Sequence, residues 1–144
     1  GLLEGKIAVV KVGAETEVEL KELADRVEDA ICAVKAAIKE GIVPGGGVAL
    51  LNASTHVKAK DTAMNVLLDA IKAPYRTILD NAGIPEVYPQ RAGTGLNVIT
   101  GKNVNMVKAG IIDPLLVTKS ALKNAASVAT TILATDCVIN NLRA

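Results

Sequence analysis

The sequence is almost free of aromatic residues. Among its 144 residues, Tyr75 and Tyr88 are the only aromatic ones, and Phe and Trp do not occur. Proteins that bind single-stranded nucleic acids stack the bases on aromatic side chains, so this class of protein is excluded. The formal net charge of +1 also lacks the basic excess of duplex-binding proteins. We therefore expect no nucleic-acid partner.

Long apolar runs and cysteine motifs are missing as well. No run approaches the ~20 apolar residues that cross a bilayer, and no basic stretch followed by an apolar one marks a signal peptide. The two cysteines, Cys32 and Cys137, form no CxxC motif and have no histidine at ligand spacing. They favour two buried thiols in a reduced, cytoplasmic setting over a disulfide or a metal site. We expect no membrane partner.

The apolar half of the sequence consists mainly of Ala, Val, Ile and Leu, with 22 alanines. Small and branched side chains suit helices that approach one another closely. The length favours one domain, or two at most, and 22% charged residues with balanced signs argue against intrinsic disorder. These features predict a mainly α protein.

A long helix is predicted over residues 17–40. Acidic residues crowd its first half, Lys35 and Lys39 lie in its last turns, and Gly41 follows as a stop signal, which matches the helix dipole. Spacings of three and four residues place six apolar side chains on one stripe. These are Leu20, Leu23, Val27, Ile31, Val34 and Ile38.

Shorter helices are predicted over residues 49–54 and 61–81, the latter interrupted at Pro74, where two helices meet or one helix kinks. Asp113 followed by Pro114 is typical of a helix start, and this last helix is predicted to run to residue 133.

Few strands are expected. Residues 6–13, 97–100 and 137–139 show short β-like patterns, and residues 83–95 are predicted to form a loop. Lone strands at the two ends would need each other or strands from another segment, so the sequence indicates part of a larger protein or an oligomer.

A glycine triplet, Gly45-Gly46-Gly47, stands between a β-like stretch and a helix start. It matches neither GxxxxGK[ST] nor GxGxxG. Two interpretations remain open: a tight turn that needs small residues, or a backbone that approaches a ligand closely.

Three polar residues are candidates for chemistry. Asp29 lies off the apolar stripe and is either a solvated surface group or a carboxylate that orients a water molecule or helps to hold a metal ion. Asp113 is either a helix N-cap or an acceptor for a ribose diol. His56, the only histidine, is expected at the surface. No catalytic triad, Cys-His pair or carboxylate pair can be argued.

Four ordered segments, spread over nearly the whole sequence, closely resemble the C-terminal part of group I chaperonins, the GroEL family. They are Lys6-Ile-Ala-Val-Val-Lys-Val-Gly-Ala-Glu-Thr-Glu-Val-Glu, Arg26-Val-Glu-Asp-Ala, Glu40-Gly-Ile-Val-Pro-Gly-Gly-Gly-Val-Ala-Leu, and Ile112-Asp-Pro with Val117-Thr-Lys-Ser-Ala-Leu and Asn124-Ala-Ala-Ser-Val-Ala.

The resemblance implies a subunit of an ATP-driven protein-folding ring. Residues 1–40 would form the second half of an intermediate domain and residues 41–144 the second half of an equatorial ATP-binding domain. The fold would be a helix-rich equatorial bundle with a long intermediate-domain helix and a few short peripheral strands. Copies of itself would be its ring partners, and unfolded client proteins and a co-chaperonin would bind an apical domain outside this sequence.

The resemblance also implies roles for individual residues. Asp29 resembles the carboxylate that swings in on ATP binding and promotes hydrolysis. Gly46 resembles a residue whose backbone lies against the nucleotide, Asn97 begins the adenine-contacting segment, where the family usually has Asn-Ala-Ala, and Asp113 resembles the ribose-binding carboxylate. The implied nucleotide-binding residues are Gly45, Gly46, Gly47, Asn97, Val98, Ile99 and Asp113.

The sequence departs from the family in several places. The GDGTT phosphate loop and the Mg²⁺-binding aspartate belong to an N-terminal half that this sequence does not contain, so no metal ligand is expected here. The loops around Lys58 and over residues 88–95 are shorter than usual, and no Gly-Met-rich tail follows Ala144, which puts a conventional double ring in question.

The hypothesis is a natural or excised piece of a divergent chaperonin without ATPase activity of its own. The alternatives are a small autonomous ATP-binding domain and a non-catalytic structural or assembly piece.

Overall fold

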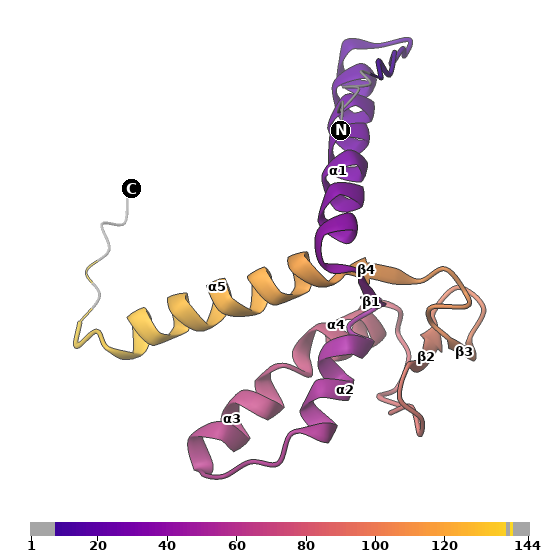
Figure 1. Ribbon diagram of the computed structural model, residues 1–144. Helices are drawn as coiled ribbons and strands as arrows, with labels where there is room; N and C mark the ends of the chain where they lie inside the picture. The colour runs from indigo at the N-terminus through magenta and orange to yellow at the C-terminus, as the bar shows by residue number, and fades with distance from the viewer. Residues whose placement is uncertain (1–7, 138, 140–144) are drawn as a thin grey trace, which may run out of the picture.

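The computed structural model describes residues 8–137 and residue 139. Helices project from a common junction, and two small sheets lie beside it (Figure 1). Helix α1 (Glu17–Glu40) stands up from the junction and α5 (Leu115–Leu133) extends to one side. Helices α2 (Val48–His56), α3 (Thr62–Ala70) and α4 (Ala73–Asn81) lie below them. The mainly α fold expected from the sequence is confirmed.

Helix α1 has the predicted bounds. It begins after Thr16, whose Oγ1 accepts a hydrogen bond from the Glu19 backbone N–H at 3.2 Å, and it ends at Gly41, which has a φ of 86°. Its apolar stripe is largely uncovered, and the side chain of Ile38 is 79% exposed. Among the described residues, the buried residue of α1 is Ala36, and Glu40 pairs with Lys119 of α5, so α1 contacts the rest of the molecule mainly near its C-terminal end.

Of the two alternatives predicted at Pro74, the structure shows two separate helices rather than one kinked helix. Helix α3 begins after Asp61, whose carboxylate accepts a hydrogen bond from the Met64 backbone N–H at 2.7 Å. Pro74 lies in the first turn of α4, where its missing N–H costs no helical hydrogen bond. The predicted helix over residues 49–54 is α2, which is slightly longer.

Two antiparallel strand pairs lie at the junction. Strand β1 (Ile42–Pro44) pairs with β4 (Ile112–Pro114), and β2 (Thr94–Asn97) pairs with β3 (Lys102–Asn105). The strand predicted over residues 97–100 is therefore wrong in its bounds. Asn97 ends the strand because its Oδ1 accepts hydrogen bonds from the backbone N–H groups of Ile99 and Thr100 in the turn, at 3.0 and 3.3 Å. Most of the predicted loop is irregular, but its last two residues belong to β2.

The predicted terminal strands are not found where the structure describes the chain. Residues 8–13 form no strand, and neither Cys137 nor residue 139 belongs to one. The remaining residues of these two predictions, 6–7 and 138, lie outside the described residues. Without a neighbouring strand, the β pattern alone supplies no ladder of hydrogen bonds.

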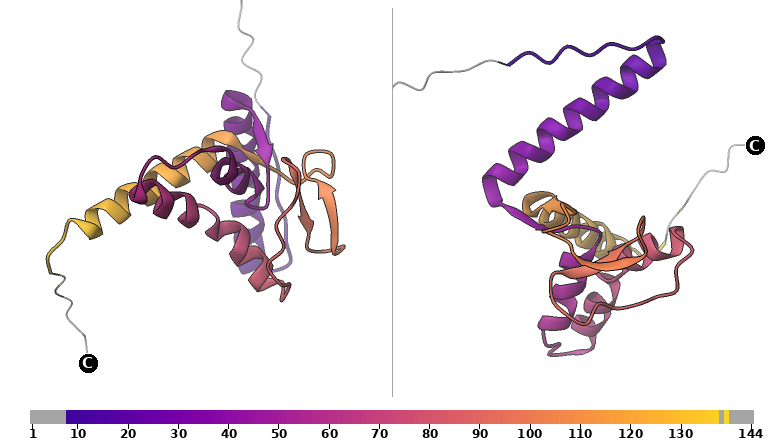
Figure 2. Two further views of the ribbon diagram at one scale, coloured as in Figure 1. Left: turned by 90° about the horizontal axis from the view of Figure 1, so that it is seen from below. Right: turned by 90° about the vertical axis from the view of Figure 1, so that its right-hand side faces the viewer.

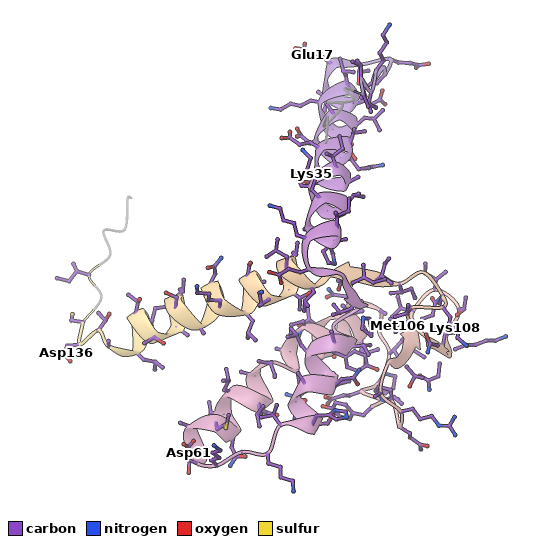
Figure 3. All side chains as sticks on the ribbon, viewed as in Figure 1. Glu17, Lys35, Asp61, Met106, Lys108 and Asp136 are labelled. Atoms are coloured by element: carbon purple, nitrogen blue, oxygen red, sulfur yellow. The ribbon has the colours of Figure 1, made fainter. Side chains whose placement is uncertain are left out.

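The core is small and lies where α2, α4 and the segment after β3 meet. Its buried residues are Val48, Leu51, Tyr75, Leu79 and Met106. Figure 3 places the Met106 side chain at this junction, whereas Lys108 points away from it. Most apolar side chains of the long helices stay outside this core, and α5 has no buried residue.

The prediction of two buried thiols is wrong, because Cys32 and Cys137 are both exposed and unpaired. Cys32 belongs to α1, which extends away from the other elements, so no other part of the described chain buries its side chain (Figure 2). In the described part of the chain, no helix is long and apolar enough to cross a membrane.

Candidate functional site

The β1–β4 pair brings the glycine triplet and Asp113 together. Val43, two residues before the triplet, lies opposite Asp113 in the ladder. The Gly45 backbone N–H then donates a hydrogen bond to the Ile111 carbonyl oxygen at 2.9 Å, which extends the pairing by one step. Residues about 70 positions apart in the sequence thus become neighbours, which no local pattern in the sequence reveals.

The triplet needs glycine for two physical reasons. Gly46 and Gly47 have φ values of 65° and 75°, in the left-handed region that disfavours side chains. A Cβ on Gly47 would lie 2.7 Å from the Tyr75 backbone nitrogen, and one on Gly46 would lie 3.0 Å from Met106 Cε. The tight-turn interpretation is therefore confirmed. Gly46 and Gly47 keep part of their surface accessible, and their contact with a ligand stays a prediction.

Helix α2 begins at this turn without a side-chain cap. Gly47 is its N-cap residue and has no side chain to accept from the first helical N–H groups. Among these groups, the Val48 N–H donates to the Gly45 carbonyl oxygen at 3.2 Å. An uncapped helix start carries partial positive charge and can donate to a negatively charged or carbonyl-bearing ligand.

Asp113 does not cap a helix, so the N-cap interpretation is wrong. It lies in β4, and Pro114 is the N-cap residue of α5, with a φ of −67° and a ψ of 129°. The ladder with β1 holds Asp113 in an extended conformation one residue too early for the cap position. The other interpretation, an acceptor for a ribose diol, stays a prediction.

The environment of the Asp113 carboxylate suits a group that accepts hydrogen bonds from a ligand. The side chain is half-buried, and this burial raises the pKa of the carboxyl group above its ordinary value. Within residues 8–137, no side-chain hydrogen bond to this carboxylate is found. Two hydroxyl donors, such as those of a ribose, would satisfy such a group.

Asn97, Val98 and Ile99 lie at the turn between β2 and β3. Asn97 is half-buried, and the side chains of Val98 and Ile99 are 38% and 91% exposed. The base of this hairpin is seated on the start of α2, because a Cβ on Gly95 would lie 2.5 Å from Val48 Cγ2. The hairpin is thus tied to the same helix start as the triplet, and its turn lies beyond that contact.

Asp29 is exposed and is not brought to the other candidates. It lies eleven residues before the end of α1 at Glu40, which is ~16 Å along the helix axis. Figure 1 shows α1 rising away from β1 and β4. A role at the site would require α1 to change its direction.

His56 is exposed, as predicted, and its Nδ1 donates to the Asn52 carbonyl oxygen at 2.7 Å. Over the described residues, no three His, Cys, Asp or Glu side chains gather as metal ligands would. The expectation that metal ligands come from outside this sequence stays a prediction.

Sequence reasoning missed the residues that hold the glycine turn in place. Tyr75 lies under Gly47, Met106 lies under Gly46, and Ile111 accepts the hydrogen bond from Gly45. The available signals were weak. Tyr75 is one of two aromatic residues, and Met106 is one of two methionines.

The fold that carries this glycine turn matches one class of protein, the chaperonins. The model of the TCP-1/cpn60 chaperonin family matches residues 1–143, and the chain belongs to this family. A crystal structure of a group III chaperonin in the open state matches with a TM-score of 0.76 and 27% identity, over 89% of this chain and 30% of that one. The chain thus spans about a third of the length of that relative. The finer assignment to group I stays a prediction.

Proposed function

We propose that this chain is part of an ATP-dependent chaperonin that assists protein folding, and that it forms the adenine and ribose side of the nucleotide site. The observation that carries the proposal is the β1–β4 ladder, which sets Asp113 beside the glycine triplet at the uncapped start of α2. The membership in the chaperonin family supports it.

The donors and acceptors present fit part of ATP. The half-buried carboxylate of Asp113 can accept hydrogen bonds from both ribose hydroxyls. Gly46 and Gly47 keep part of their surface accessible, so a nucleotide can contact their backbone, whereas Gly45 is buried and ties the turn to Ile111. Asn97, Val98 and Ile99 would supply polar and apolar contacts to adenine.

The triphosphate and its Mg²⁺ need further residues. This sequence has no GDGTT motif, and the proposal assigns the phosphate loop and the metal-binding aspartate to another part of the full-length protein. Bound ATP would supply the phosphoanhydride bond whose hydrolysis drives the folding cycle.

Asp29 would act as the hydrolysis-promoting carboxylate by orienting the attacking water molecule. This role requires α1 to swing toward β1. Gly41 would be the pivot, because it joins α1 to β1 and has no Cβ to restrict its φ and ψ angles. Two contacts hold the present orientation. Lys119 Nζ lies 2.6 Å from a Glu40 carboxylate oxygen, and the Leu115 N–H donates to the Gly41 carbonyl oxygen at 3.1 Å.

The proposal includes the larger assembly. Residues 1–40 would belong to an intermediate domain and residues 41–144 to an equatorial domain of a cytoplasmic protein. Copies of the subunit would form a ring, and unfolded clients and a co-chaperonin would bind elsewhere on the full-length protein. The exposed apolar side chains of α1 and α5 would be covered in such an assembly.

The substitution Asp29→Ala in a full-length subunit tests the assigned roles. We expect hydrolysis to fall by 10²-fold or more with nucleotide binding nearly unchanged, because the carboxylate would act only on the attacking water molecule. ATP turnover and equilibrium nucleotide binding are the two measurements. Glu28→Ala changes an exposed neighbour on α1 and serves as the matched control. Equal loss of hydrolysis and binding would contradict the role of Asp29.

The chain by itself should show no ATP turnover above background, since the phosphate and metal residues are assigned elsewhere. Turnover by this chain that is lost in Asp29→Ala would overturn the proposal and support an autonomous enzyme. A defined oligomer that does not respond to nucleotide, even in the full-length protein, would support an assembly role.

A further inference from the structure

A hollow lies beside the C-terminal half of α2, away from the glycine turn. It has a volume of about 490 Å³, within the size range of sites for small molecules. One wall is the last part of α2 and the other is the segment around Tyr88 and Arg91. The lining includes Leu51, Lys72, Tyr88, Pro89, Arg91 and Ala92.

The charged lining of this hollow has one sign. Lys72 and Arg91 contribute to it, and neither Asp nor Glu does. Lys72 Nζ lies 3.2 Å from a carboxylate oxygen of Asp69, which is exposed and lies outside the hollow. Ion pairs with a solvent-exposed partner contribute little. In the part of the chain that the structure describes, Arg91 makes no ion pair. The whole chain is nearly neutral, so this segregation of charge is local.

The segment that carries Arg91 is held at both ends. The Tyr88 ring stacks on the buried Tyr75 ring, with centroids 6.3 Å apart. The Arg91 carbonyl oxygen accepts two hydrogen bonds from Thr94, one from the backbone N–H at 3.2 Å and one from Oγ1 at 2.6 Å. The wall is therefore preorganised, which reduces the conformational entropy that a ligand must remove on binding.

The side chains at the end of α2 include no carboxylate, and three of them bind carbonyl oxygens of the same helix. Here Ser54 Oγ donates to the Leu51 carbonyl oxygen at 2.7 Å, and Thr55 Oγ1 and His56 Nδ1 both donate to that of Asn52, at 2.8 and 2.7 Å. The Asn52 and Gln90 side-chain amides add neutral donors to the lining.

We propose that this hollow binds a small phosphate-bearing anion. Arg91 and Lys72 would hold the phosphate oxygens, and Leu51, Pro89 and Ala92 would contact an apolar part of the molecule. The site is separate from the ribose-binding carboxylate. It lies beside the C-terminal half of α2, a helix of nine residues that is ~13 Å long.

Inorganic pyrophosphate is the probe, titrated into the chain at low salt and followed by backbone amide shifts in NMR spectra. We expect saturable shifts centred on residues 88–92 and on the end of α2. The double variant Lys72→Gln/Arg91→Gln should bind at least tenfold more weakly. The matched control, Lys39→Gln/Lys123→Gln, removes two exposed cations elsewhere and should change affinity less than twofold.

Three results would overturn the proposal: no saturable binding, equal weakening in both double variants, or shifts confined to the glycine turn. The last result would place the anion at the start of α2 and would leave the proposed nucleotide site intact. Circular dichroism of each variant shows whether its fold is retained, and the single variants Arg91→Gln and Lys72→Gln replace a double variant that does not fold.

Discussion

At the scale of single residues, the burial of Asp113 costs stability in the ligand-free protein, but its carboxylate suits a ligand. Its burial makes the charged carboxylate less favourable, which raises its pKa, and no side chain within the described residues compensates for it. A group that destabilises the ligand-free protein and suits a ligand is typical of a functional site. Its extended backbone places it opposite Val43 and next to the glycine turn.

We predict that Asp113→Asn stabilises the ligand-free chain and weakens nucleotide binding. The amide removes the cost of burying a charge, but it also loses charge-assisted hydrogen bonds worth ~1.5–3 kcal/mol, so the affinity of a full-length subunit should fall by about tenfold or more. Denaturant unfolding measures the first effect and calorimetry with ATP measures the second. A variant that is less stable and binds ATP normally would contradict the assigned role.

The stabilisation of the ligand-free chain by Asp113→Asn should decrease as the pH falls. Because the folded-state pKa of Asp113 is raised, the folded chain binds this proton more tightly than the unfolded chain does. The destabilising effect of the carboxylate is complete above the folded-state pKa and disappears as the pH falls toward the ordinary value of ~3.9. The stability difference between Asp113→Asn and the unchanged chain should therefore shrink over that range.

At the scale of elements, the seating of α2 on α4 decides the shape of the glycine turn. Gly47 allows the start of α2 to approach the Tyr75 backbone to a distance at which a Cβ would clash. Gly95 plays the same part between the β2–β3 hairpin and α2. Three elements thus converge on one helix start, and small residues are required at each contact.

We predict that Gly47→Ala destabilises the chain by ~2 kcal/mol or more, because a left-handed φ and a backbone clash add together. Gly83→Ala is the matched control. Gly83 has a similar φ of 65°, but a Cβ there meets nothing within 4 Å, so only the conformational cost of ~1 kcal/mol remains. Urea unfolding of both variants gives the comparison. Equal losses would show that α2 can shift to accept the side chain.

At the scale of the whole molecule, two long helices leave a small core. Leu133 is 86% exposed and Ile38 is 79% exposed, and the buried residues concentrate in α2, α4 and the segment at Met106. Figure 2 shows α1 and α5 extending away from this centre. Such an arrangement places much of the apolar surface where only further protein can cover it.

We predict that hydrogen exchange in this chain is uneven. The amides of α4 should be protected most, because Tyr75 and Leu79 anchor that helix in the core. The amides of α5 should exchange faster by tenfold or more, because no side chain of α5 is buried. Mass spectrometry on peptides measures both, with the denatured chain as the reference. Equal protection of α4 and α5 would mean that self-association covers α5 in solution.

Much of the secondary structure follows from local patterns. The bounds of α1 come from the spacing of its apolar residues, the Thr16 cap and the Gly41 stop, all of which act within one or two turns. Pro74 divides α3 from α4 because it lacks a backbone N–H. The strands were predicted less well, since a strand exists only where a partner lies beside it. The chain turns directly after Asn97, the first residue of the predicted strand.

The sequence by itself determined that this is a helix-rich protein with a long first helix, and its ordered motifs indicated the chaperonin family. Only the tertiary structure decided that Asp113 lies in a strand beside the glycine turn and that Cys32 is exposed. The physical reason is the range of the interactions. Caps, helix periodicity and glycine turns act between residues near in sequence, whereas ladders, close backbone contacts and burial depend on segments that meet only in the folded chain.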